Sequence, residues 1–143
     1  MAEISFYVLP TAKESARLGL VLKLVEKAYE AREPAYLLFD DKEFMNDADR
    51  AIWGMRDDAF IPHTVLTSAD DIDALDLIYL SAEEFAVPNR SLLINLSRTF
   101  PPRHTEFQRI FEIITKNPDS IQISRNRYRE YRDLGYEIKT HIL

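Results

Sequence analysis

The first forty residues constrain the fold most, because two short apolar runs flank one amphipathic stretch. Residues 4–9 (ISFYVL) and 35–39 (AYLLF) are apolar, too short for helices and bounded by Pro or Asp, which predicts two strands. Between them, apolar residues recur at helical spacing over residues 14–31, which predicts an amphipathic helix. A strand, a crossover helix and a second strand form a βαβ unit with parallel strands and a right-handed connection. The sequence therefore predicts an α/β fold.

The rest of the chain adds elements of both kinds. In order, we expect a helix over residues 41–54 capped by Asp41, a connection over 55–76, strands over 75–80 and 92–96, helices over 105–115 and 120–134, and an edge strand over 136–142. The chain of 143 residues is long enough to bury a core without disulfides, and it contains no Cys. We expect a single domain spanning residues 1–143.

Sites for nucleotides, metals and covalent catalysis are disfavoured. The loop after the first strand, residues 9–14, has neither GxGxxG nor GxxxxGK spacing, which argues against a nucleotide-binding loop. The three His residues do not have the spacing of metal ligands, so no metal or cofactor is expected. Ser97 lacks the elbow of a serine hydrolase, and Asp40 and Asp41 are interpreted as a helix cap and a solvated neighbour. A small α/β enzyme with its site near these three residues remains an alternative.

The net charge and the hydropathy pattern limit the partners. The formal net charge is -6, the wrong sign for a domain that holds a nucleic-acid backbone across a broad face. No apolar run approaches the roughly 20 residues of a membrane span, and the N-terminus has no pattern of a signal peptide. We therefore expect a cytoplasmic protein that does not bind membranes.

One face of the last predicted helix has a distinctive chemistry. Arg125, Tyr128, Arg129 and Arg132 follow i, i+3, i+4 and i+7 spacing, so they share one side of the helix. Guanidinium groups bind carboxylates with two parallel hydrogen bonds, and a ring or an aliphatic residue such as Ile114 can support an apolar side chain. This face could therefore bind an acidic peptide or a free carboxylate. It could equally be an exposed surface whose Arg side chains pair with local acids.

A second apolar feature lies in the long connection. Trp53, at the end of a predicted helix, is the only Trp, and Phe60, Ile61 and Pro62 form an apolar cluster where a connection is usually polar. These residues could be buried in the core. Alternatively they form a protein-binding hot spot, because aromatic residues are common anchors of interfaces.

Several segments together resemble one protein family. They are the strand FYVL, the segment AIWGMRDDAFIPH, the strand SLLINLS and the final RNRYREYRDLGY. In this order they resemble the chi subunit family of bacterial DNA polymerase III holoenzyme over almost the whole chain. The resemblance implies a Rossmann-like, three-layer fold with a mostly parallel sheet. It also implies an accessory subunit of the clamp-loader complex in DNA replication rather than an enzyme.

The resemblance further implies two protein partners and a set of contact residues. Family members bridge the psi subunit of the clamp loader and the acidic, phenylalanine-ended C-terminal tail of single-stranded-DNA-binding protein, and so contact DNA only indirectly. By position, Arg125 would bind the terminal carboxylate and Ile114 would contact the phenyl ring. The residues implied for the tail are Arg125, Tyr128, Arg129, Trp53 and Ile114, and those for psi are Phe60, Ile61 and Pro62. A direct single-stranded nucleic-acid binder that stacks bases on Tyr128 is a further alternative.

Overall fold

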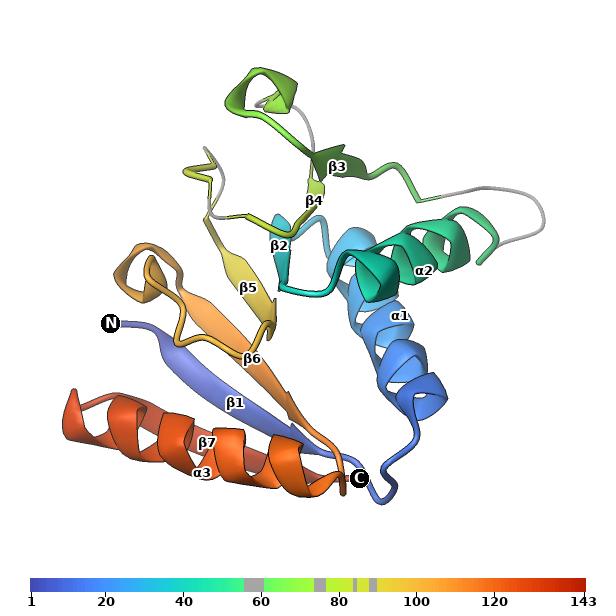
Figure 1. The fold of residues 1–143 in the computed structure, drawn as a ribbon. Helices are drawn as coiled ribbons and strands as arrows, with labels where there is room; N and C mark the ends of the chain where they lie inside the picture. Colours follow the sequence, from blue (N-terminus) through green and yellow to red (C-terminus); the bar gives the residue numbers. More distant parts are fainter. Residues whose placement is uncertain (56–60, 74–76, 84, 88–89) are drawn as a thin grey trace.

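The computed structural model describes residues 1–55, 61–73, 77–83, 85–87 and 90–143. Within these residues, seven strands form one parallel sheet in the order β3-β4-β2-β5-β6-β1-β7. The elements are β1 Glu3–Val8, α1 Glu14–Glu30, β2 Ala35–Phe39, α2 Lys42–Trp53, β3 Thr64–Leu66, the 3₁₀ helix η1 Ala69–Asp71, β4 Ile78–Ser81, β5 Leu92–Leu96, the 3₁₀ helix η2 His104–Glu106, β6 Arg109–Ile114, α3 Pro118–Asp133 and β7 Glu137–Ile142. The predicted α/β fold with a mostly parallel sheet is confirmed (Figure 1).

The helices cover both faces of the sheet, which gives three layers (Figure 1). Alternate side chains of a strand point to opposite faces. Thus Leu37 of β2 packs in one core cluster with α1 and α2, whereas its neighbours Tyr36 and Leu38 pack in a second cluster with Tyr131 of α3. The basic helix α3 therefore lies on the opposite face of the sheet from α1 and α2.

Local sequence signals explain where the helices begin and end. Asp41 accepts hydrogen bonds from the backbone N–H groups of Glu43 and Phe44 at 2.9 and 3.3 Å, which confirms the predicted cap of α2. Asn117 caps α3 in the same way, with a Pro in the first turn. After α3, Gly135 has a φ of 86°, a left-handed conformation that Gly adopts without steric cost, and the chain turns into β7.

The helix predicted over residues 105–115 is wrong. The structure has η2 and then the strand β6, which lies between β5 and β1 inside the sheet. Because β6 is covered on both faces, consecutive residues such as Ile110 and Phe111 are both buried. A continuous apolar run of this kind also contains residues at helical spacing, so the periodicity did not distinguish the two structures.

The predicted connection over residues 55–76 contains more regular structure than expected. In its described part, β3 pairs with β4 at one edge of the sheet, and η1 follows with a capping box formed by Ser68 and Asp71. At the opposite edge, the predicted strand β7 is confirmed and pairs with β1. None of the described helices has the length and apolar character of a membrane span.

Candidate functional site

A small hollow lies between α3 and the sheet. It has a volume of about 190 Å³. Its walls come from β1, β6, α3 and β7, and the residues that line it are Phe6, Ile114, Ile121, Ser124, Arg125, Tyr128 and Thr140. A cavity of about 150 Å³ can hold a benzene ring, so this hollow is large enough for one phenyl side chain.

The floor and one wall of the hollow are aromatic. Phe6 of β1 is buried, and its ring centroid lies 5.7 Å from that of Tyr128 and 6.2 Å from that of Tyr131. Tyr128 remains 42% exposed, so its ring is supported from below and open to a ligand. Ile114, at the end of β6, adds an aliphatic surface. The hollow is therefore preformed and mostly apolar.

Arg125 gives the hollow a positive charge. Its side chain is exposed and has no hydrogen bond or ion pair with any residue that the structure describes. By contrast, Arg129 donates to the side-chain oxygen of Asn126 at 3.0 Å, and Arg132 pairs with Asp133 at 3.2 Å. Of the residues implied for the tail, the structure thus brings Arg125, Tyr128 and Ile114 together at the hollow and places Arg129 outside its lining.

Trp53, which the resemblance grouped with these residues, does not line this hollow. It ends α2, on the opposite face of the sheet from α3, and its ring centroid lies 4.6 Å from that of His63 (Figure 1). His63 is held by Asp49, whose carboxylate is 2.6 Å from Nε2, and by the backbone carbonyl of Ile61, 2.9 Å from Nδ1. Trp53 is 47% exposed, so it forms part of a separate surface.

The three residues predicted to bind psi have different positions. Ile61 is fully buried in the core cluster beneath α2, so its side chain is not available to a partner. Pro62 is exposed, and Phe60 lies outside the described residues. The exposed surface near the end of α2 therefore contains Pro62 together with Trp53.

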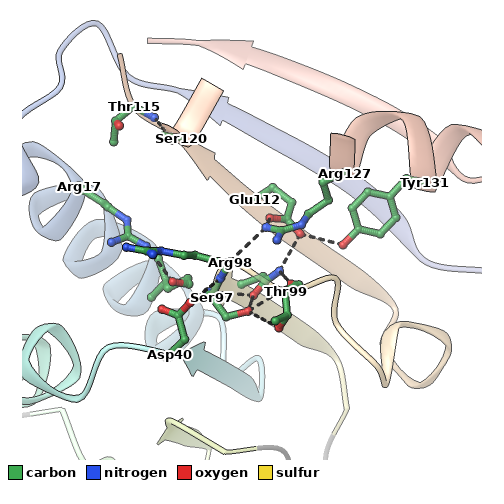
Figure 2. Close-up of polar contacts among 12 residues, drawn as sticks. Arg17, Asp40, Ser97, Arg98, Thr99, Glu112, Thr115, Ser120, Arg127 and Tyr131 are labelled. Carbon is green, nitrogen blue, oxygen red and sulfur yellow. Dashed lines mark hydrogen bonds and ion pairs between the residues drawn. The ribbon is translucent and has the colours of Figure 1, made fainter. Parts of the chain in front are cut away.

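A buried polar cluster under α3 was not predicted from the sequence (Figure 2). Glu112 of β6 pairs with Arg127 at 2.8 Å, and it accepts hydrogen bonds from the Tyr131 hydroxyl at 2.8 Å and the Asn95 amide at 3.0 Å. Burial raises the pKa of Glu112 above its ordinary value, while Arg127 and the hydrogen bonds oppose this shift. The signal in the sequence was an acid inside the apolar run RIFEII.

A larger cleft of about 400 Å³ lies at the carboxyl ends of β2, β5 and β6. Asp40, Asp41 and Ser97 line it, but their polar atoms already have partners in the fold. The Ser97 hydroxyl donates to the Asn95 side chain at 2.7 Å, and Asp40 accepts the backbone N–H of Arg98 at 2.7 Å (Figure 2). His104 contacts the Tyr136 hydroxyl. Within the described chain, no three acidic or His side chains form a group that could hold a metal ion.

Comparison with known structures supports the fold. The chain resembles a crystal structure of T4 UvsW with a TM-score of 0.68 and 9% sequence identity. The match covers 99% of this chain and 41% of the longer UvsW chain. At this identity, the likeness concerns the fold alone.

Sequence comparison gives the family. A model described as "DNA polymerase III chi subunit, HolC" matches residues 1–139. The DNA polymerase III subunit chi of Pseudomonas aeruginosa is 34% identical over 143 residues, covering 100% of this chain and 98% of the relative. The protein of the same name from Escherichia coli K12 is 22% identical, with 98% and 97% covered. The chain therefore belongs to the DNA polymerase III chi subunit family, and its role is that of an accessory subunit in DNA replication.

Proposed function

We propose that this chain is a non-catalytic adaptor with two separate protein-binding surfaces. The hollow beside α3 binds the acidic, phenylalanine-ended C-terminal tail of single-stranded-DNA-binding protein, and the surface around Trp53 and Pro62 binds the psi subunit of the clamp loader. The observation that carries the first assignment is an apolar hollow of about 190 Å³ beside Arg125, whose guanidinium has no partner in the described structure. Contact with DNA is then indirect.

The hollow matches the two chemical features of such a tail. The terminal phenyl ring would fill the space between Phe6, Ile114 and Tyr128, where aromatic and aliphatic groups replace water. The terminal carboxylate would then lie near Arg125, whose planar guanidinium can donate two parallel hydrogen bonds to it. Acidic residues earlier in the tail would approach Arg129, one turn further along α3.

Replacing Arg125 by Ala should weaken tail binding at least tenfold, because a hydrogen bond to a charged group contributes about 1.5–3 kcal/mol. Fluorescence anisotropy with a labelled acidic peptide that ends in Asp-Ile-Pro-Phe measures this change. Arg50→Ala is the matched control, since it removes the same charge from an exposed helix position on the other face. Its affinity should stay within about twofold of wild type, because exposed charges this far apart are largely screened.

Changes in the peptide also test whether Arg125 binds the terminal carboxylate. Amidation of its C-terminus should reproduce the loss caused by Arg125→Ala, and the two changes together should add little further loss. Equal affinity of the wild type and Arg125→Ala would contradict the site. Tight binding of bare single-stranded DNA by the purified protein, abolished by Tyr128→Ala, would favour the direct nucleic-acid binder instead.

The second surface is supported by how Trp53 is held. An exposed Trp is a typical interface hot spot, and here its ring packs on His63, which is bonded on both sides. The ring is thus fixed before a partner arrives, which lowers the entropy lost on binding. Because α2 and α3 lie on opposite faces of the sheet, the chain could bind both partners at once (Figure 1).

Trp53→Ala should remove at least 2 kcal/mol of psi binding, roughly a thirtyfold loss, while tail binding stays unchanged. Calorimetric titration of purified psi into each variant measures the first quantity, and the peptide assay measures the second. Arg125→Ala is the control with the opposite pattern. If Trp53→Ala weakens binding of the tail peptide and leaves psi binding intact, the assignment of Trp53 to the psi surface is contradicted.

A further inference from the structure

The helix that supports the tail site is attached to the sheet in an unusual way. The buried residues of α3 are Ser124, Arg127 and Tyr131, all with polar groups. In contrast, α1 buries five apolar residues, Leu20, Val21, Leu24, Val25 and Ala28. Hydrophobic contact is not directional, whereas hydrogen bonds require defined geometry. The Tyr131 ring packs on Phe6, Phe100 and Tyr136, and the polar contacts add the directional constraint on the rotation of α3 about its axis.

Glu112 is the common partner of these contacts. Its Oε1 lies 2.8 Å from Nη1 of Arg127, and its Oε2 accepts the Tyr131 hydroxyl at 2.8 Å. Arg127 also donates to the backbone carbonyl of Ser97 at 3.3 Å. Two residues one turn apart on α3 are thus tied to both oxygens of a single carboxyl group on β6 (Figure 2).

Such a buried pair is a poor source of stability. Removing two charges from water costs about as much as their attraction returns, and apolar replacements of similar volume are often equally stable. The pair is therefore better explained by the orientation that it gives to α3 than by a gain in folding stability. We propose that Glu112 and Arg127 are positioning residues of the tail site: they hold α3 at the rotation that places Arg125 and Tyr128 at the hollow. This inference rests on the function proposed above for that hollow.

The helical geometry gives the reason. Arg125 and Tyr128 lie two residues before and one residue after Arg127, and each residue turns the helix by about 100°. A rotation that follows loss of the pair therefore moves Arg125 and Tyr128 together relative to Ile114 and Phe6, which belong to the sheet. The apolar hollow and its guanidinium would no longer face the same ligand.

The double variant Glu112→Gln/Arg127→Met tests this role. It removes both charges, leaves the net charge unchanged and keeps an amide oxygen that can accept from Tyr131. The control, Asp47→Asn/Arg50→Met, removes an exposed ion pair on α2 in the same charge-neutral way. Three readouts are needed: the denaturation midpoint, peptide affinity by anisotropy, and the NMR shifts of the Ile114 and Ile121 δ1 methyl groups.

We expect the double variant to stay folded, to bind the peptide at least tenfold more weakly than wild type, and to show altered shifts of both methyl groups. Both residues line the hollow, and a rotation of α3 moves Ile121 relative to the Phe6 ring of the sheet and moves the Tyr128 ring relative to Ile114. The control should match wild type in all three readouts. Wild-type affinity with unchanged methyl shifts in the folded double variant would overturn the inference. The methyl shifts are measured without peptide. If the wild type fails to bind the tail peptide, the proposed function is refuted, and the methyl shifts of the double variant still show whether Glu112 and Arg127 position α3.

Discussion

Replacing Arg127 by Met alone should lower the free energy of unfolding by about 3–5 kcal/mol, because it leaves the carboxyl group of Glu112 buried without its cation. The remaining hydrogen bonds from Tyr131 and Asn95 do not replace a charge in an interior position. Urea denaturation of the variant and the wild type measures the difference. Arg50→Met is the matched control and should change the free energy of unfolding by less than about 1 kcal/mol, since its ion pair is exposed.

The same variant should show a distinct pH dependence. Burial raises the pKa of Glu112 above its ordinary value of 4.5, and Arg127 is the strongest influence that lowers it, so the pKa rises further when Arg127 is lost. A carboxyl group with a raised pKa in the folded state stabilises the protein below the ordinary value, and this contribution is lost as the pH rises.

The deficit of Arg127→Met relative to wild type should therefore be larger at pH 8 than at pH 4.5. The charge-free double variant Glu112→Gln/Arg127→Met should recover most of the stability at pH 8. A deficit that grows toward acid pH, or a double variant as unstable as the single one, would contradict this account of the pair.

Replacing Phe6 by Ala should also cost about 3–5 kcal/mol of folding stability. Phe6 is 1% exposed in the inner strand β1, and its ring packs against Tyr128 and Tyr131. Truncation removes this contact area and leaves a cavity under α3. Thermal and urea denaturation measure the loss, and Ala replacement of the half-buried Phe100 is a control for which we expect a smaller effect.

Phe6→Leu separates packing from binding. It keeps most of the buried volume, so it should lose less stability than Phe6→Ala. Because Phe6 also forms the floor of the hollow, the folded Leu variant should still bind the tail peptide more weakly than wild type. Equal losses of stability for Ala and Leu would show that the packing of the ring is not the source of the effect.

Much of the fold could be predicted from local patterns in the sequence. The strand over residues 35–39, the helix capped by Asp41 and the basic helix that ends near Gly135 were all confirmed. Each of these segments carries its own signal in the sequence, which is a short apolar run, a capping side chain or a Gly at the expected end of a helix. The motifs that resembled the chi subunit family were supported by the family match over residues 1–139.

The failures concern residues whose environment is made by distant parts of the chain. The apolar run of β6 fits a helix until one knows that strands lie on both sides of it. Trp53 and Arg125 are both exposed residues at helices, and nothing in their spacing shows that the helices lie on opposite faces of the sheet. A resemblance to a family indicates which residues occupy matching positions, but it does not give the distance in space between two of those residues.

By itself, the sequence determined the α/β class and the position of the basic helix. It also determined that Arg125 and Tyr128 share one side of that helix, because helical periodicity and capping act over a few residues. Only the tertiary structure decided that Phe6 forms the floor of the hollow, that Trp53 lies on another surface, and that Glu112 binds both Arg127 and Tyr131. These contacts join residues far apart in the chain, and they depend on strand order and on the packing of α3 against the sheet. Neither is encoded in a local pattern.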